Sequence, residues 1–317
     1  MKMRIGVAVL LATALVSLNA FAQRRSVSIP PLRSKMIVTT DWLADHLRNP
    51  KVVVLHVGRN RADYDAGHIP GARFLSLSDI AIVRDGIPNE LPPVADLRKA
   101  FERVGVGDDT RAILYDEQDG LLAARAYFTL DYLGHGDRAA LLDGGIEKWR
   151  SEERPVTNDF PKVEPASFTP KVNPKVLVKL PEVRRISAAA SAGNSSTVLI
   201  DARPAEEFSG EKPGDAVTRA GHIPGARNLF WMENLESSDK PELKPPPELR
   251  KMWKAAGAVP GKRVVTYCRT GVQASHAYFT AKFLGYDAAM YDGSFLEWSN
   301  ASDTKVKRSE PKGTGNE

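Results

Sequence analysis

The most nucleophilic side chain in this sequence is that of Cys268, the single cysteine among 317 residues. An apolar stretch, 263–267, precedes it, and a stretch with the character of a helix, 275–284, follows it. A thiol placed where a strand ends and a helix begins faces backbone N–H groups and the positive end of a helix dipole. These features favour the thiolate, which is the nucleophilic form. We therefore expect a reactive cysteine, against the alternative of a buried thiol that only fills space.

The loop after the cysteine has the residue types to bind an anion. Its members are Arg269, Thr270, Gly271, Val272, Gln273 and Ala274. Arg269 offers a planar set of donors to the oxygens of an anion, unless it is a surface arginine that contacts only solvent. Thr270 either donates its hydroxyl to a substrate or caps the following helix. Gly271 allows a tight turn that points N–H groups inward.

Cysteine phosphatases use a similar loop, but they need the pattern Cys-x5-Arg, in which the arginine clamps the phosphate. The arginine position of that pattern is Ala274 here, and Tyr267 stands where a histidine would precede the cysteine. The loop is therefore a poor match to a phosphatase. A lone cysteine also excludes a CxxC redox pair and a multi-cysteine metal site. We expect no metal and no cofactor.

The N-terminus has the pattern of a cleaved secretory signal. Lys2 and Arg4 precede an apolar run over 5–18, and the A-x-A site is residues 20–22. The apolar run is too short to span a bilayer, so we expect cleavage before Gln23 and a periplasmic or secreted protein. Loss of the two basic residues takes the formal charge from +5 to +3. That balance gives no argument for binding nucleic acid or a membrane surface.

The chain repeats itself. Residues 66–73 recur letter for letter at 220–227, and shorter blocks align in the same order on either side of this match. The halves are therefore related domains. The repeat predicts a first domain over 36–150 and a second over 176–300. The N-terminal pattern adds a signal peptide over 1–22, the density of prolines indicates a linker over 151–175, and polar composition without periodicity indicates a disordered tail over 301–317.

Each half alternates short β-branched runs with helical patterns. The runs at 52–57, 112–115, 198–201 and 264–267 are expected to be buried strands. Helices are expected at 93–104 and 247–256, each followed by a glycine. This alternation predicts an α/β fold with one parallel sheet, flanked by helices, in each half. Ligands bind such sheets at the carboxyl ends of the strands, which is where Cys268 falls.

The strand–Cys–loop–helix of Cys268, the Asp201-x-Arg203 strand end and the paired Gly-His-Ile-Pro-Gly-Ala turns together resemble the rhodanese family of sulfurtransferases. More narrowly, the chain is similar to exported tandem-domain thiosulfate sulfurtransferases. The resemblance implies two rhodanese-like domains, of which the second is catalytic. It also implies a persulfide on Cys268 that passes its sulfur from a small anionic donor to a thiophilic acceptor, such as cyanide or a thiol. Asp201 and Arg203 either brace the loop or form an ordinary structural ion pair.

The first copy carries a carboxylate where the second carries the thiol. Aligning the two strands places Asp116 opposite Cys268, in the acidic loop 116–120. A carboxylate there repels an anion and is a poor sulfur acceptor, so we expect the first domain to be a scaffold. His68 and His222 occur in both identical turns, and are expected to be structural for that reason. No residue pairs His276 with Cys268 as a base.

Two features of the residues point in opposite directions on the sulfur donor. The mercaptopyruvate branch of the family typically has a small uncharged loop, so the pair Arg269-Thr270 favours an inorganic anion such as thiosulfate. Against this, Glu207 stands at about the position where well-known members carry a substrate-binding arginine, and Lys212 or Arg219 could substitute for it. A mercaptopyruvate sulfurtransferase and a non-catalytic persulfide carrier or sensor are the alternatives, and a protein sulfur acceptor is left open.

Overall fold

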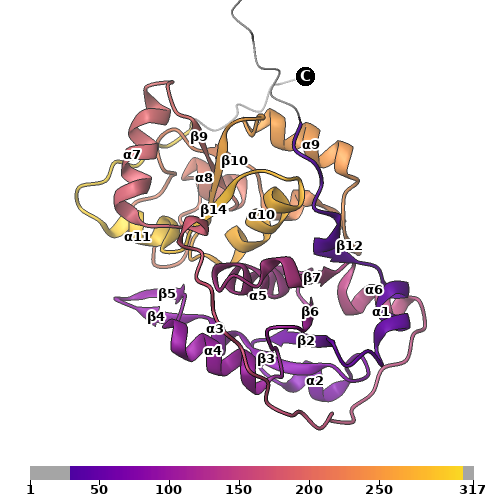
Figure 1. Ribbon diagram of the computed structural model, residues 1–317. Coiled ribbons are helices and arrows are strands. Elements are labelled where there is room, and N and C mark those ends of the chain that lie inside the picture. The colour runs from indigo at the N-terminus through magenta and orange to yellow at the C-terminus, as the bar shows by residue number, and fades with distance from the viewer. Residues whose placement is uncertain (1–28, 310–317) are drawn as a thin grey trace, which may run out of the picture.

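The computed structural model describes residues 29–309, which form two α/β domains stacked on one another (Figure 1). The signal peptide predicted for 1–22 lies outside the described residues, as does the segment 310–317. Within residues 29–309, no helix is long and apolar enough to cross a membrane.

Five parallel strands form the sheet of the first domain, in the order β1-β7-β6-β2-β3. They are β1 (Ile37–Val38), β2 (Val52–Gly58), β3 (Arg73–Ser76), β6 (Arg111–Tyr115) and β7 (Ala139–Leu142). The helices are α1 (Thr40–His46), α2 (Ala62–Ala66), α3 (Leu77–Ile80), α4 (Val94–Arg103), α5 (Leu121–Tyr132) and α6 (Gly145–Ser151). A small hairpin of β4 (Ile82–Arg84) and β5 (Ile87–Glu90) projects from the domain.

The second domain repeats this plan, with the parallel order β8-β14-β13-β9-β10. Its strands are β8 (Leu177–Val178), β9 (Thr197–Asp201), β10 (Arg227–Asn228), β13 (Arg263–Tyr267) and β14 (Ala288–Tyr291). Its helices are α7 (Leu180–Ser191), α8 (Ala205–Ser209), α9 (Pro246–Ala255), α10 (Val272–Phe283) and α11 (Ser294–Asn300), and its hairpin is β11 (Leu235–Ser237) with β12 (Lys240–Leu243). The predicted α/β fold with a parallel sheet in each half is confirmed.

The two domains share a central core. Helices α5 and α10 lie side by side between the two sheets (Figure 1). Tyr127 of α5 meets Phe279 of α10 edge-on at 4.9 Å between ring centroids, and Phe128 meets Tyr278 in the same way at 5.2 Å. These residues occupy matching positions of the repeat, so each residue contacts the counterpart of its neighbour, as in a symmetric dimer. One hydrophobic cluster therefore runs across both domains.

The tail predicted to be disordered over 301–317 is ordered as far as residue 309. Lys307 pairs with His222 through two backbone hydrogen bonds, and the Trp298 indole N–H donates to the carbonyl of Lys305 at 2.8 Å. The first domain does the same after α6, where Thr157 pairs with His68 and Trp149 donates to the carbonyl of Pro155. The repeat therefore continues past each last helix. The prediction of disorder was wrong for residues 301–309, because residues distant in the sequence hold this segment in place. We call the segment 301–309 the strap.

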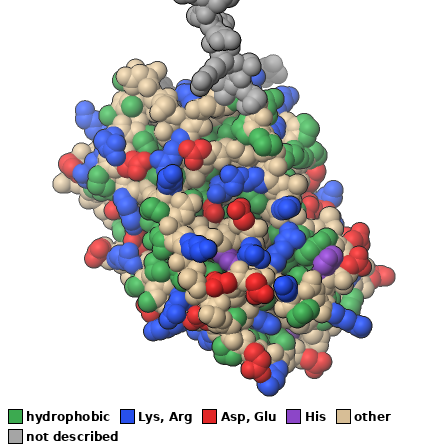
Figure 2. All heavy atoms as spheres, in the orientation of Figure 1, with side chains coloured by type: hydrophobic (Ala, Val, Ile, Leu, Met, Phe, Trp, Pro, Cys, Tyr) green, Lys and Arg blue, Asp and Glu red, His purple; other side chains and the backbone are tan. Residues whose placement is uncertain are grey.

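Charges are mixed on the surface. On the face shown in Figure 2, basic and acidic side chains alternate without a large area of one sign.

The two histidines of the repeated turns lie inside the fold. The ring of His68 stacks on Tyr64 of α2, and the ring of His222 stacks on Phe208 of α8, each with 3.8 Å between ring centroids. Both therefore have the structural role that their presence in both copies indicated.

Candidate active site

Cys268 lies directly after β13, and its side chain is almost fully enclosed, with 1% of it exposed. The Gly271 N–H donates to its Sγ at 3.1 Å. Burial raises the pKa of the thiol, and the backbone N–H groups of Ala274, Thr270 and Gly271 oppose that rise. The N–H groups therefore favour the thiolate at the start of α10, where the helix dipole acts in the same direction.

Gly271 is the residue that brings these N–H groups inward. It is the N-cap of α10 and has φ +95°, a backbone conformation that L-residues with a side chain rarely adopt. No side chain caps the helix, so Thr270 is not its cap. An added Cβ at Gly271 would lie 2.9 Å from Oδ1 of Asp292 and 3.4 Å from Nη1 of Arg125. The loop thus packs tightly against the side chains of Asp292 and Arg125.

That charged pair joins the two domains. Arg125 of α5 donates to Asp292 at 2.6 Å, and both side chains are fully buried. Arg125 also donates to the carbonyl of Asn89, whose amide in turn donates to the Thr270 hydroxyl oxygen at 3.0 Å. The first domain therefore contacts the Cys268 loop directly at Thr270 through Asn89, and supports its neighbour Asp292 through Arg125. No signal in the sequence pointed to Asn89 or Arg125, because their contacts connect the two halves. For Asp292 the only signal was that an Asp-Gly pair recurs at this point of the repeat.

Arg269 is bound by carboxylates. It donates to Glu207 at 2.6 Å through Nη2 and at 3.2 Å through Nε, and to Asp215 at 3.2 Å through Nη1. The hydrogen bond with Glu207 raises the pKa of Arg269, and the negative charge of a Cys268 thiolate acts in the same direction. Arg269 is therefore held by two carboxylates and is not the solvent-only surface arginine of the alternative interpretation.

The other three loop residues supply backbone and packing. Val272 and Ala274 are buried, and Gln273 is half-buried. The carbonyl of Ala274 accepts the Thr266 hydroxyl at 3.0 Å, which ties the first turn of α10 to β13.

Asp201 and Arg203 form a buried ion pair at the end of β9. Arg203 binds both carboxylate oxygens of Asp201, at 2.9 Å and 2.6 Å, and its guanidinium lies 4.0 Å from the centre of the Phe295 ring. Arg203 also lies 3.9 Å from Glu207. The pair is thus structural in its main contacts and reaches the loop through Glu207, which binds Arg269.

The cations proposed as substitutes for the missing arginine are not at the loop. Arg219 donates to four carbonyls at and beyond the end of α11, those of Trp298, Ser299, Ala301 and Thr304. It therefore fixes the strap after that helix. Lys212 is exposed and lies 4.0 Å from Glu206. Neither side chain is placed by these contacts to bind a substrate beside Cys268.

The first domain has a loop with the same architecture at 116–120, and a carboxylate of that loop accepts its N–H groups. Asp116 is fully buried and accepts four backbone N–H groups, from Gln118, Gly120, Leu122 and Ala123, at 2.5–2.9 Å. Burial raises the pKa of this carboxyl and the four N–H groups oppose the rise. The loop 116–120 is therefore an anion-binding loop like that of Cys268, and the carboxylate of Asp116 occupies it.

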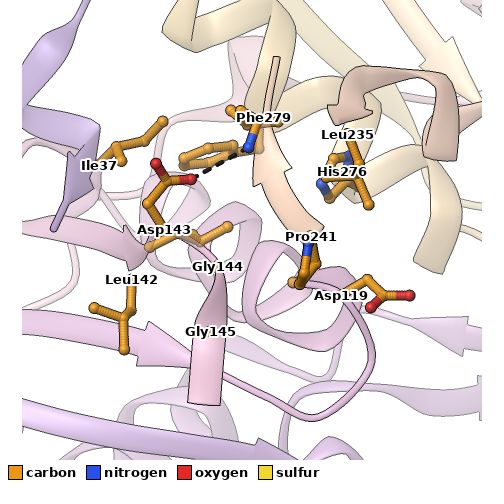
Figure 3. Close-up of a pocket in the computed structure, with 13 residues that line it drawn as sticks. Ile37, Asp119, Leu142, Asp143, Gly144, Gly145, Leu235, Pro241, His276 and Phe279 are labelled. Atoms are coloured by element: carbon orange, nitrogen blue, oxygen red, sulfur yellow. Dashed lines mark hydrogen bonds between the residues drawn. The ribbon is translucent and has the colours of Figure 1, made fainter. Parts of the chain in front are cut away.

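A separate small cavity lies between the domains on the side of the first-domain loop (Figure 3). Its volume is about 20 Å³, and Asp119, Asp143, Pro241 and His276 are among the residues that line it. His276 occupies the repeat position of Arg125, and burial lowers its pKa to about 4. Cys268 does not line this cavity, and among the described residues no hydrogen bond joins His276 to the thiol.

Comparison with known proteins also finds one domain type twice in the chain. The model of the rhodanese-like domain matches residues 39–152 and 186–301. The sulfur carrier protein TtuD of Thermus thermophilus is 34% identical over 288 residues, which are 87% of this chain and 98% of that protein. A putative thiosulfate sulfurtransferase of Mycolicibacterium smegmatis is 31% identical (84% and 96% covered), and a probable 3-mercaptopyruvate sulfurtransferase of Pseudomonas aeruginosa is 33% identical (84% and 96%).

Solved structures share the fold. The anaerobic ergothioneine biosynthesis enzyme of Chlorobium limicola superposes with a TM-score of 0.76 at 26% identity, over 87% of this chain and 71% of that one. The structure of YnjE superposes with the same TM-score at 24% identity, over 87% and 69% of the two chains.

Proposed function

The chain belongs to the rhodanese-like family, and on that premise we propose that it is a sulfurtransferase that carries the outer sulfur of thiosulfate as a persulfide on Cys268. The observation that carries the proposal is the hydrogen bond from Gly271 to Sγ, at the N-terminus of a twelve-residue helix. It places the only thiol of the chain where an anionic sulfur is stabilised. The relatives named as sulfurtransferases support the same reaction class.

The reaction proceeds in two displacements. The Cys268 thiolate attacks the outer sulfur of thiosulfate, the S–S bond breaks, and sulfite leaves with the bonding electron pair. The terminal sulfur of the persulfide then carries the negative charge that the N–H groups of the loop stabilise. Cyanide, or a thiolate, attacks that terminal sulfur and leaves as thiocyanate or as a new persulfide, which restores the thiolate. The burial of Cys268 keeps water from the persulfide between the two steps.

Intact mass spectrometry tests the proposal directly, because one cysteine gives an unambiguous assignment. Thiosulfate should add the mass of one sulfur atom, and cyanide should remove it with release of thiocyanate. Cys268→Ser should gain no sulfur and show no turnover while its thermal unfolding is unchanged. Thiocyanate production by this variant at the wild-type rate would defeat the assignment of the nucleophile.

A sulfur carrier is the second candidate, supported by the name of the Thermus relative and by the engagement of Arg269 with two carboxylates. A carrier loads one sulfur per chain and turns over slowly with cyanide. An enzyme turns over many times under the same conditions. Replacing thiosulfate with 3-mercaptopyruvate in the same assay decides between the two donor classes named among the relatives.

We also propose that the chain is exported, on the support of the basic, apolar and A-x-A segments of residues 1–22. N-terminal sequencing of the mature protein should begin at Gln23. A mature chain that retains Met1 would overturn this proposal.

A further inference from the structure

Every nitrogen of the Arg269 guanidinium already has a carboxylate partner. Nε and Nη2 form a two-point contact with Glu207, and Nη1 binds Asp215. Two of the three oxygens at the sulfonate end of thiosulfate can accept the same pair of N–H groups that a carboxylate accepts. Three of the five guanidinium N–H groups are used in this way, and Glu207 occupies the whole Nε–Nη2 edge. An anionic donor can therefore make a two-point contact with that edge only after it displaces Glu207.

Glu207 is held in this position from both sides. Its side chain is 10% exposed, and Arg203 lies 3.9 Å away as a second cation. The segment 210–219 packs on the pair, since an added Cβ at Gly214 would lie 2.5 Å from Nε of Arg269 and 2.8 Å from Oε2 of Glu207. Asp215 of the same segment is fully exposed and contributes a weaker, screened contact.

Arg269 and the four charged side chains that are linked to it carry a net negative charge. Asp201, Glu207 and Asp215 contribute three negative charges, and Arg203 and Arg269 contribute two positive ones, which leaves −1. This net charge opposes the approach of a dianion such as thiosulfate more than the approach of a donor of lower charge.

We propose that Glu207 determines donor specificity, because it is an internal counter-ion of Arg269 that an anionic donor must displace to reach the Nε–Nη2 edge of the guanidinium. This inference rests on the proposed function. Glu207 thereby disfavours dianionic sulfur donors and leaves monoanionic or neutral ones less affected. The segment 210–219 reinforces the pair through Asp215 and through the close approach of its backbone at Gly214.

The test is the steady-state rate of thiocyanate formation with Glu207→Gln, an isosteric change that removes the charge. The KM for thiosulfate should fall about tenfold, which corresponds to ~1.4 kcal/mol, with kcat changed less than twofold. Asp215→Asn removes an exposed charge without risk to folding. It should lower KM by about two- to threefold at low salt and have no effect at 0.5 M salt, where exposed pairs are screened.

A matched control exists in the same domain. Glu182 binds Arg263 at 2.8 Å at the opposite, N-terminal end of β13. Glu182→Gln removes the same charge from a similar pair and should leave KM within twofold of wild type.

Mass spectrometry separates the two ways in which the inference can fail. A normal persulfide in wild type and Glu207→Gln, with an unchanged or higher KM in both Glu207→Gln and Asp215→Asn, overturns the role of Glu207 and leaves the proposed function standing. Persulfide in Glu207→Gln but not in wild type supports the role of Glu207. Absence of persulfide in both overturns thiosulfate as the donor, and the role of Glu207 with it.

Discussion

Replacing Gly271 with alanine tests the physical basis of the catalytic loop. At φ +95° an L-residue incurs a cost of roughly 1–2 kcal/mol, because its Cβ is too close to the neighbouring backbone. The added methyl group would also lie 2.9 Å from Oδ1 and 3.0 Å from the backbone oxygen of Asp292. Both atoms belong to a buried, ion-paired residue that has little freedom to move. Overpacking of this kind costs about 1–3 kcal/mol more.

The first domain supplies the control. Gly120 is the N-cap of α5 with φ +81°, and its N–H donates to Asp116 as that of Gly271 donates to Cys268. An added Cβ at Gly120 would meet its nearest atom at 3.8 Å, which is ordinary van der Waals contact. Gly120→Ala should therefore show the backbone cost alone, roughly 1–2 kcal/mol. Gly271→Ala should show both costs, about 2–5 kcal/mol in total.

Urea unfolding measures the two free energies, and alkylation with iodoacetamide measures the reactivity of the single cysteine. Gly271→Ala should also slow persulfide formation, because relief of the clash moves the Gly271 N–H away from Sγ. Gly120→Ala should react with thiosulfate as fast as wild type. Equal losses of stability in the two variants would show that Asp292 does not crowd position 271, and wild-type persulfide formation in Gly271→Ala would show that the Gly271 N–H is not needed at Sγ.

Two further predictions follow from buried charges at the domain contact. Arg125→Met leaves the buried Asp292 without its ion-pair partner, and should lower the free energy of unfolding in urea by about 3–5 kcal/mol; a loss below 1 kcal/mol would contradict the pairing. Burial lowers the pKa of His276 from 6.5 to about 4, so the unfolded chain binds more protons between those pH values and stability falls as pH drops through that window. His276→Leu should remove about 3 kcal/mol of this pH dependence, and an unchanged slope would show that His276 does not titrate on unfolding.

Local patterns in the sequence were enough to predict the fold. The β-branched runs at 198–201 and 264–267 became β9 and β13, because a strand buried on both faces needs an uninterrupted apolar run. The helix expected at 247–256 became α9 at Pro246–Ala255. The repeat predicted two related domains, and the two sheets have equivalent strand orders.

The partners of the site residues could not be predicted in the same way. Arg269 meets Glu207 across 62 positions of the chain, and Thr270 meets Asn89 across 181. Neither pair has a periodicity or a motif, since each is created by the packing of one element against another. The strap over 301–309 was missed for the same reason, although the alignment of Trp149 with Trp298 was a signal that the repeat could continue beyond α11.

The duplication separates what the loop architecture does from what the thiol does. Both loops follow a buried strand, end at a glycine with positive φ, and direct N–H groups at the first side chain after the strand. In the first domain that side chain is the carboxylate of Asp116, which receives four N–H groups and so occupies the loop permanently. In the second it is a thiol, and its negative charge is present only as thiolate or persulfide. The architecture therefore stabilises an anion in either domain, and the side chain decides whether that anion is a fixed part of the fold or a sulfur that reacts.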